Sequence, residues 1–253
     1  MGILDKHLAR LRDQTAWITG GKRIGRMVAR VLAEQGVHVV ASYRVSEKEA
    51  DETAAEARQL GVRAITVHAD VSSLASIRTA VERVQAEFPR IHILVNMASV
   101  YRPVAWNEVT PTDWEDHFSA HVLGTFWPTQ LIVPLMPAGA HIINIADITS
   151  VAQAQPANLP YVVTKAAVAS MTRAMALEYA GQGLFVNALA PGPILAPEDY
   201  PAEKWARIRD RSPVKYPVTD EEAVEQFALL VLYLSMTTMS TGQIYPLDQG
   251  QHL

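Results

Sequence analysis

The chain has 253 residues, of which 49% are hydrophobic and 19% charged, enough for one large α/β domain or two small ones. A net charge of −4 argues against nucleic acid as a partner, and the absence of cysteine excludes disulfides, thiolate zinc sites and a thiol nucleophile. No apolar run is long enough to span a membrane and the charged N-terminus is unlike a secretory signal, so we expect a cytoplasmic protein without a membrane partner or a metal.

Hydrophobic patterning predicts the elements in chain order. Leu4, Leu8 and Leu11 share one helical face, which predicts a short N-terminal helix over 3–12. Strands are predicted at Thr15–Thr19, Val37–Ser42, Arg63–His68, Ile91–Asn96, His141–Ala146, Leu184–Ala188 and Gln243–Pro246, and helices at about 24–35, 47–60, 74–87, 111–134, 160–180 and 220–235. Apolar strands alternating with helices predict a parallel sheet covered on both faces, in which ligands bind beyond the carboxyl ends of the strands.

Local signals mark several boundaries. Ser46 followed by Glu49 predicts a capping box, and Thr110-Pro111-Thr112-Asp113 predicts a capped helix start with proline at its first position. The proline-rich, charged segment 195–218 predicts a flap over the substrate, with a short helix near 202–210. Packing against a partner subunit is an equal explanation for this segment. Its candidates for covering the substrate are Leu195, Tyr200 and Trp205.

The first strand runs through a glycine turn, "TGGKRIG", into a helix. Such a turn lets the backbone approach a phosphate, and the helix N-terminus favours the anion. Gly21 in this turn is expected to supply backbone freedom. The predicted cofactor contacts of this turn are Gly20, Lys22, Arg23 and Ile24.

The second strand ends in Ser42, Tyr43 and Arg44, without the acid that binds the ribose of NAD. A cation and hydroxyl groups suit the 2′-phosphate of NADP, so NADPH is the expected cofactor; alternatively, Arg44 is a solvated loop residue. Further contacts are expected after the third and fourth strands, with the adenine near Asp70 and Val71 and the nicotinamide near Asn96 and Ala98.

Tyr161 and Lys165 lie one turn apart on one helical face. A cationic neighbour is expected to lower the tyrosine pKa from its usual value of about 10, toward the range where proton transfer is efficient. Asp147 ends the apolar strand "HIINIA", where it is either a turn residue or a catalytic acid. Its position at the carboxyl end of a buried strand favours the catalytic interpretation.

Taken together, these motifs resemble the short-chain dehydrogenase/reductase family over nearly the whole chain. The matching segments are Thr19-Gly20…Gly25, Asp70, "VNMAS", Tyr161/Lys165, "VNALAPGPI" and "STGQIYPLDQG". The resemblance implies a single Rossmann-like, doubly wound domain over 1–253 with a seven-stranded sheet, and a homo-oligomer, more often a tetramer than a dimer. It also implies that Tyr161 donates the proton, that Lys165 binds the nicotinamide ribose, and that the cofactor contacts Pro191, Gly192 and Ile194.

Departures from the family pattern resemble its pteridine-reductase branch, which includes the dihydromonapterin reductases. Asp147 takes the place of the serine that polarises the substrate carbonyl, although Thr149 is also near the expected spacing. In that branch Arg23 reaches phosphate and pterin, Ser99 contacts cofactor or pterin, and Tyr101 stacks on the pterin, although Tyr101 also fits an ordinary loop aromatic. The ending "PLDQGQHL" is similar to that of the same branch. His121 replaces an asparagine that helps to hold a water, unless it is simply packed.

The sequence therefore predicts an NADPH-dependent reductase of a dihydropterin. The substrate contacts expected are Arg23, Ser99, Tyr101, Asp147, Tyr161, Leu195 and Trp205, and the catalytic residues Asp147, Tyr161, Lys165 and His121. A general NADPH ketoreductase using Thr149 or Ser150 is the first alternative. A catalytically silent NADPH-binding sensor or scaffold is the second.

Overall fold

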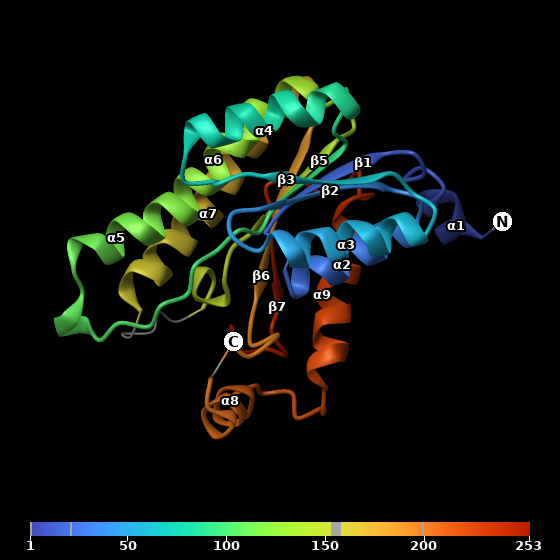
Figure 1. Cartoon of the computed structure of the whole chain (residues 1–253). Helices are drawn as coiled ribbons and strands as arrows, with labels where there is room; N and C mark the ends of the chain where they lie inside the picture. The colour runs from blue at the N-terminus through green and yellow to red at the C-terminus, as the bar shows by residue number, and fades with distance from the viewer. Residues whose placement is uncertain (1, 21, 153–157, 199) are drawn as a thin grey trace.

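Seven parallel strands form one sheet in the order β3-β2-β1-β4-β5-β6-β7 (Figure 1). The structure is a computed structural model that describes residues 2–20, 22–152, 158–198 and 200–253. The strands are β1 Thr15–Thr19, β2 His38–Tyr43, β3 Ala64–His68, β4 Ile93–Asn96, β5 His141–Ile145, β6 Phe185–Pro191 and β7 Ile244–Leu247. The strand order reverses between β1 and β4, which creates a ligand-binding crevice at their carboxyl ends. All seven predicted strands are confirmed, with boundaries displaced by a few residues.

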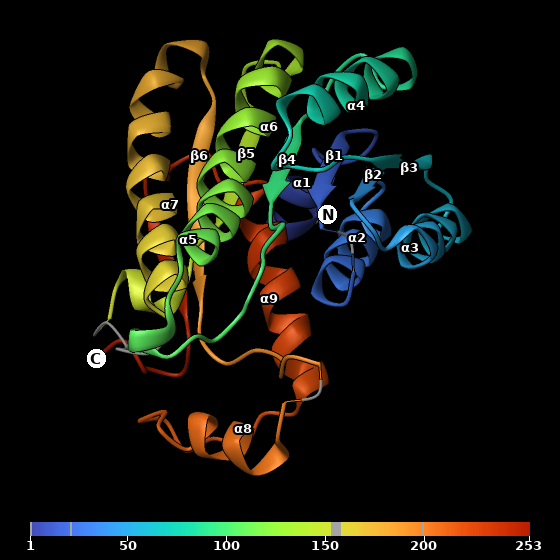
Figure 2. The ribbon, with the colours of Figure 1, turned by 60° about the vertical axis from the view of Figure 1, so that its left-hand side comes forward.

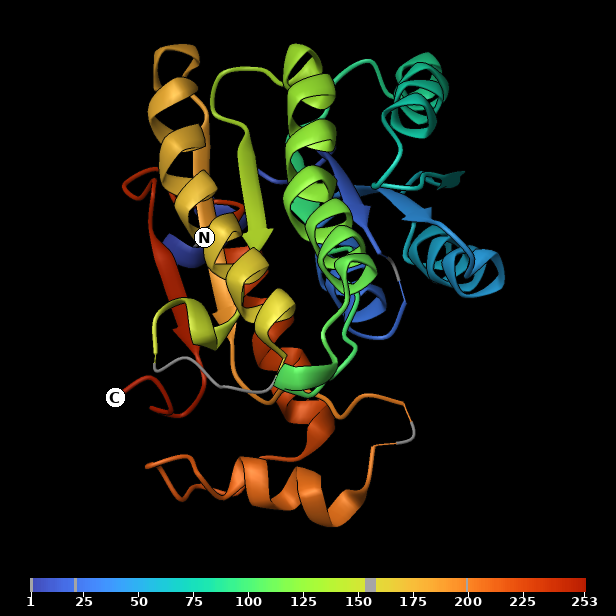
Figure 3. The ribbon, with the colours of Figure 1, turned by 90° about the vertical axis from the view of Figure 1, so that its left-hand side faces the viewer.

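Helices cover both faces of the sheet (Figure 2). One face carries α2 Ile24–Glu34, α3 Glu47–Gln59 and α9 Asp220–Leu234, and the other carries α4 Leu74–Glu87, α5 Pro111–His117, α6 Gly124–Ile132 and α7 Leu159–Glu178. The short helix α8, Ala202–Arg209, confirms the helix predicted near 202–210 and lies beyond the carboxyl ends of the strands (Figure 3). This arrangement is the predicted doubly wound, Rossmann-like fold.

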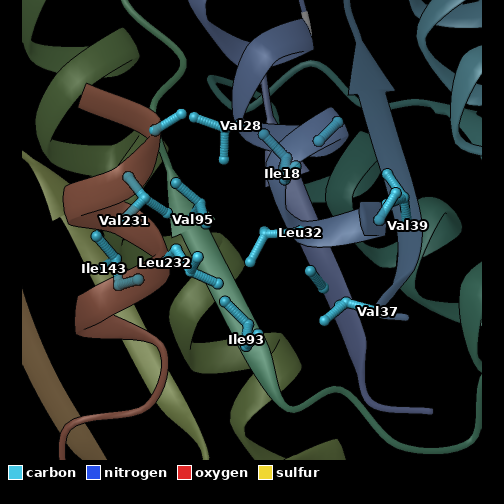
Figure 4. Close-up of a cluster of buried hydrophobic side chains, with 14 of the residues drawn as sticks. Ile18, Val28, Leu32, Val37, Val39, Ile93, Val95, Ile143, Val231 and Leu232 are labelled. Atoms are coloured by element: carbon cyan, nitrogen blue, oxygen red, sulfur yellow. The ribbon is translucent and has the colours of Figure 1, made fainter. Parts of the chain in front are cut away.

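The core under α2 and α9 is built from branched aliphatic side chains (Figure 4). Val28 and Leu32 of α2 and Val231 of α9 are completely buried against strand residues such as Ile18 and Val95. Burial of such side chains stabilises each by about 1.5–3 kcal/mol. This packing fixes the carboxyl ends of the central strands, where the cavities lie.

The helix predicted over 111–134 is interrupted. Its first part begins with the expected cap, since the Thr110 hydroxyl accepts from the Asp113 N–H at 3.4 Å and Pro111 occupies the first turn. A π-helical segment, Phe118–Leu123, separates α5 from α6, and Pro128 lies inside α6. The prediction of one regular helix over 111–134 was wrong in detail, because the π-helical segment divides it into α5 and α6. Such π-helical turns are often found at functional sites.

Two further local predictions need correction. The N-terminal helix α1 spans only Ile3–Leu8, and Leu11 reaches the core from the turn that follows. Ser46 precedes α3, but its side chain makes no capping hydrogen bond. Glu49 instead pairs with Lys22, at 3.4 Å between Nζ and Oε1. This long-range ion pair takes the place of the predicted capping box.

Candidate active site

Two adjoining cavities open at the carboxyl edge of the sheet. The first, about 390 Å³, lies beyond β1, β2 and β3, and the second, about 400 Å³, lies beyond β5 and β6. Five residues line both cavities: Arg23, Ile24, Met97, Ser99 and Leu195. A dinucleotide in the first cavity would therefore direct one end into the second, so we refer to them as the cofactor cavity and the substrate cavity.

The glycine turn shapes the cofactor cavity. Gly20 has φ of +78°, and a Cβ there would stand 3.1 Å from the Cα of Ala98. A Cβ on Gly25 would stand 2.5 Å from the carbonyl oxygen of Gly20, so only glycine lets α2 start this close to β1. The N-terminus of α2 consequently faces the cavity and suits a phosphate group. Gly21 lies outside the described residues.

The end of β2 presents one cation to the cofactor cavity. Arg44 is exposed and lines the cavity, together with Ser42 and Tyr43. The Ser42 hydroxyl is engaged inside the sheet, where it accepts from Trp17 Nε1 at 3.2 Å and donates to the Ile18 carbonyl at 3.2 Å. The Tyr43 hydroxyl donates to Glu47 at 2.6 Å, and this bond raises the Tyr43 pKa to about 12. Arg44 thus remains the best-placed of the three for a 2′-phosphate.

Lys22 and Arg23 connect the glycine turn to the flap. Lys22 Nζ lies 3.0 Å from Glu198 Oε1, and hydrogen bonding to Glu198 and to Glu49 raises the Lys22 pKa. Arg23 adopts φ of +54°, the region that favours glycine. Its guanidinium donates to the Ala196 carbonyl, and its side chain lines both cavities.

The ends of β3 and β4 complete the cofactor cavity, with Asp70, Val71, Ala98 and Ser99 in its wall. Asp70 Oδ1 accepts from the backbone N–H of Ser72 at 3.0 Å, which fixes the carboxylate. Asn96 differs from its prediction, because it lines neither cavity. It is buried, and its Nδ2 donates to Asn144 Oδ1 and Thr129 Oγ1, each at 2.9 Å. The Asn96 side chain therefore joins β4 to β5 and α6.

Asp147 and Tyr161 meet in the substrate cavity. The Tyr161 hydroxyl donates to Asp147 Oδ2 at 2.9 Å. Asp147 Oδ1 accepts from the N–H of Thr149 at 2.9 Å and from its hydroxyl at 2.7 Å. Asp147 also caps the short 3₁₀ turn Ile148–Ser150. The two interpretations of Asp147 are thus compatible, since one carboxylate oxygen forms the turn and the other contacts the tyrosine.

The electrostatics of this pair differ from the expectation. Burial raises the Tyr161 pKa well above its usual value, and the Asp147 carboxylate raises it further, both as a like charge and as a hydrogen-bond acceptor. Lys165 Nζ is 5.9 Å from the centre of the tyrosine ring and donates to the Ile145 carbonyl at 2.8 Å. Burial lowers the Lys165 pKa to about 8, against the opposing effect of Asp147. The predicted lowering of the tyrosine pKa was wrong, because Asp147 lies much nearer than the ammonium.

His121 is packed rather than open to either cavity. It is 1% exposed, its Nδ1 lies 2.8 Å from Thr164 Oγ1, and its Nε2 lies 2.9 Å from Ser99 Oγ. Thr164 donates its hydroxyl proton to Pro160 O at 2.7 Å, so the histidine must carry its proton on Nδ1. Burial and the nearby Lys165 lower the His121 pKa to about 2. His121 is consequently a neutral residue that ties Ser99 to α7.

The remaining predicted residues line the substrate cavity. These are Tyr101, Pro191, Gly192, Ile194, Leu195, Tyr200 and Trp205. Tyr101 meets the Tyr161 ring edge-on at a centroid distance of 5.1 Å, and Tyr200 meets Trp205 at 6.3 Å. The flap and the loop after β4 thus both contribute aromatic side chains to the cavity that holds the polar pair. Asp199, within the predicted flap, lies outside the described residues.

Two polar residues of the substrate cavity were missed from the sequence. Asn158 adopts a left-handed conformation before α7, and its Nδ2 donates to the Tyr101 hydroxyl at 3.1 Å. Gln251, near the C-terminus, also lines the substrate cavity. The one sequence signal near Gln251 was the similarity of the ending "PLDQGQHL" to that of the pteridine-reductase branch. Among the described residues, no cluster of acids and histidines suits a metal ion, and no helix is long and apolar enough to cross a membrane.

Similar proteins share this architecture. A family profile described as Enoyl-(Acyl carrier protein) reductase matches residues 20–252. The uncharacterized oxidoreductase YhxC of Bacillus subtilis (strain 168) is 30% identical over 252 residues, covering 97% of this chain and 87% of YhxC. A 3-oxoacyl-(acyl-carrier-protein) reductase FabG of Staphylococcus epidermidis is 32% identical over 188 residues, covering 73% of this chain and 76% of FabG. A solved short chain dehydrogenase from Burkholderia cenocepacia J2315, in complex with NADP, matches with a TM-score of 0.88 at 26% identity and covers 96% of this chain and 100% of its own.

Proposed function

The chain belongs to the short-chain dehydrogenase/reductase family, and we propose that within this family of NAD(P)-dependent oxidoreductases it reduces a dihydropterin with NADPH. One observation carries the proposal: a carboxylate, Asp147, accepts the hydrogen bond of the Tyr161 hydroxyl at 2.9 Å. An ionised carboxylate cannot donate to a carbonyl oxygen, but it readily accepts from the N–H groups of a pterin. A carboxylate at this position therefore favours a pterin, which offers N–H donors, over an ordinary ketone, which offers only an acceptor oxygen.

NADPH is the cofactor, and the described residues fit it. The glycines at the start of α2 leave room for the pyrophosphate, and Arg44 and Lys22 provide cations at the rim of the cofactor cavity. Ser99 and Leu195 line the junction with the substrate cavity, where the nicotinamide would lie. When bound, NADPH supplies the hydride that reduces the C=N carbon of the substrate.

The protein supplies the proton and orients the substrate. Tyr161 retains its proton at neutral pH, because burial and Asp147 hold its pKa high. It can therefore donate to the ring nitrogen of the reduced C=N bond, with Asp147 binding an adjacent N–H of the substrate. Lys165 places its buried amine beside the pair, 5.9 Å from the centre of the Tyr161 ring, and Asp147 opposes the lowering of the Lys165 pKa by burial.

A ketoreductase is the second candidate, because the Staphylococcus relative is a 3-oxoacyl reductase. Such an enzyme needs a hydroxyl that donates to the substrate carbonyl. The Thr149 hydroxyl instead donates to Asp147 at 2.7 Å, and the Ser150 hydroxyl lies 3.3 Å from both the Asp147 N–H and the Lys165 carbonyl. Both hydroxyls are held within the 3₁₀ turn that Asp147 caps, which favours the dihydropterin.

A matched pair of variants tests the assignment. Asp147→Asn removes the charge but keeps the shape, and Thr149→Val removes the hydroxyl but keeps the carboxylate. We expect Asp147→Asn to lower kcat/KM for a dihydropterin by about 100-fold and Thr149→Val to lower it by less than about threefold. The reverse pattern, with ketones as the better substrates, would establish the ketoreductase.

We also propose a homo-oligomer, with a tetramer favoured over a dimer. The π segment and α7 expose large apolar side chains, with Phe118 48%, Val163 44% and Leu177 82% exposed. Side chains of this kind are frequently covered in assemblies. Light scattering on the purified protein tests this: a monomer at micromolar concentration contradicts it.

A further inference from the structure

The last residues of the chain form a turn fixed to the sheet edge. The carboxylate of Asp248, which is 9% exposed, accepts from the backbone N–H of Gly250 at 3.0 Å and from that of His252 at 2.7 Å. A Cβ on Gly192 would stand 2.7 Å from the Cβ of Asp248, so this turn packs directly on the end of β6, where the flap begins. We call residues Asp248–His252 the C-terminal turn.

The C-terminal turn also holds the second half of the flap. Gln251 binds the last turn of α8 and the residues after it, and Gln249 binds the segment that leads to α9. The hydrogen bonds are Gln251 Nε2 to the Ile208 carbonyl at 3.0 Å and to Ser212 Oγ at 2.8 Å, Gln249 Nε2 to the Tyr216 carbonyl at 2.9 Å, and the Val214 N–H to the Gln249 carbonyl at 3.2 Å. The flap is therefore tethered by a segment remote from it in sequence.

Hydrogen bonding fixes the orientation of the Gln251 amide. The Ile208 carbonyl can only accept, so the amide nitrogen must face it. The second amide proton is directed to Ser212, which is 2% exposed. The oxygen Oε1 is left without a hydrogen bond among the described residues, although the side chain lines the substrate cavity. An acceptor held in this way suits an N–H or O–H donor of the substrate.

We propose that the C-terminal turn is a substrate-specificity element: it holds α8 over the substrate cavity and presents Gln251 Oε1 to a donor group on the substrate. The inference rests on the proposed function for the nature of that donor, which in a dihydropterin is an N–H group of the ring. Trp205 and Ile208 of α8 line the same cavity, so the turn controls both the apolar cover and one polar contact. Neither contact involves the cofactor cavity.

The first test separates substrate binding from cofactor binding. Gln251→Met has a similar length but no hydrogen-bonding group, and loss of one such bond to a substrate raises KM by about tenfold. We expect kcat to change by less than about threefold and the Kd of NADPH by less than about twofold. Ser212→Ala, which loosens the amide but leaves Oε1 in place, should raise KM by about threefold. Gln243→Met, at an exposed glutamine outside both cavities, is the matched control.

The second test needs no substrate. Removal of residues 251–253 should increase hydrogen exchange of the backbone amides in 202–216 by about tenfold or more, with no change in α2. An unchanged KM in Gln251→Met, or unchanged exchange after the removal, would overturn the inference. If the wild type reduces only ketones, the proposed function fails, while the exchange experiment still decides the role of the C-terminal turn.

Discussion

Replacement of Asp147 by asparagine should move the alkaline limb of the pH profile to lower pH. The Tyr161 oxygen lies 2.9 Å from Asp147 Oδ2, and two negative charges at that distance repel by about 6 kcal/mol at an effective dielectric constant of about 20. Tyr161 therefore stays protonated while Asp147 is ionised. Asp147 also raises the Lys165 pKa, which burial lowers to about 8. Loss of the carboxylate lowers the pKa values of both groups.

In the wild type, kcat/KM is expected to begin its alkaline decline near pH 8, where Lys165 loses its proton. In Asp147→Asn the limb should begin below this value, and kcat/KM at neutral pH should fall by about 100-fold. The assay is initial NADPH oxidation with a dihydropterin at a series of pH values. A variant whose kcat/KM stays within about threefold, with an unmoved limb, refutes the reasoning. Urea unfolding should show that the variant is folded, because its Oδ1 still accepts from the Thr149 N–H.

Four other substitutions give separable results. Arg44→Gln should weaken NADPH binding by about tenfold or more and leave NADH binding unchanged in titrations, because only NADPH carries the 2′-phosphate. Gly20→Ala should destabilise the protein by about 1–3 kcal/mol in urea unfolding and weaken NADPH, since φ is +78° and Ala98 is close. Lys165→Met should abolish turnover. Its stability relative to wild type should decrease from pH 8 to 10.5, because across that range the unfolded wild-type chain still binds the proton that the folded chain has released, so wild-type stability rises with pH. His141→Phe should reduce the loss of stability between pH 6.5 and 4, because burial lowers the His141 pKa to about 4 and only the unfolded chain binds the proton.

Elements with strong periodicity were predictable from the sequence. The strand "HIINIA" is buried on both faces and delivers Asp147 to the edge of the sheet, as its apolar run indicated. Tyr161 and Lys165 lie on one face of α7 because their spacing requires it. The first turn of α7 lies at the same edge of the sheet, so it places Tyr161 beside Asp147.

Long-range contacts were not predictable in the same way. The interruption of the helix after His117 has the same hydrophobic pattern as a regular helix, so only the structure shows it. The sign of the Tyr161 pKa shift depends on the distances to Asp147 and Lys165, which sequence spacing does not give. Gln251 lines the substrate cavity because the C-terminal turn packs on α8 through side-chain hydrogen bonds. Such hydrogen bonds produce no periodic pattern in the sequence.

The most direct test is the rate of NADPH oxidation by the purified protein with dihydrobiopterin, dihydromonapterin, dihydrofolate, a 3-oxoacyl thioester and simple ketones, with NADH in parallel. The proposed function predicts the highest kcat/KM with a dihydropterin and NADPH, and little turnover with NADH. Turnover confined to the 3-oxoacyl thioester or the ketones would contradict it, and Asp147 would then be a turn residue beside a ketoreductase site.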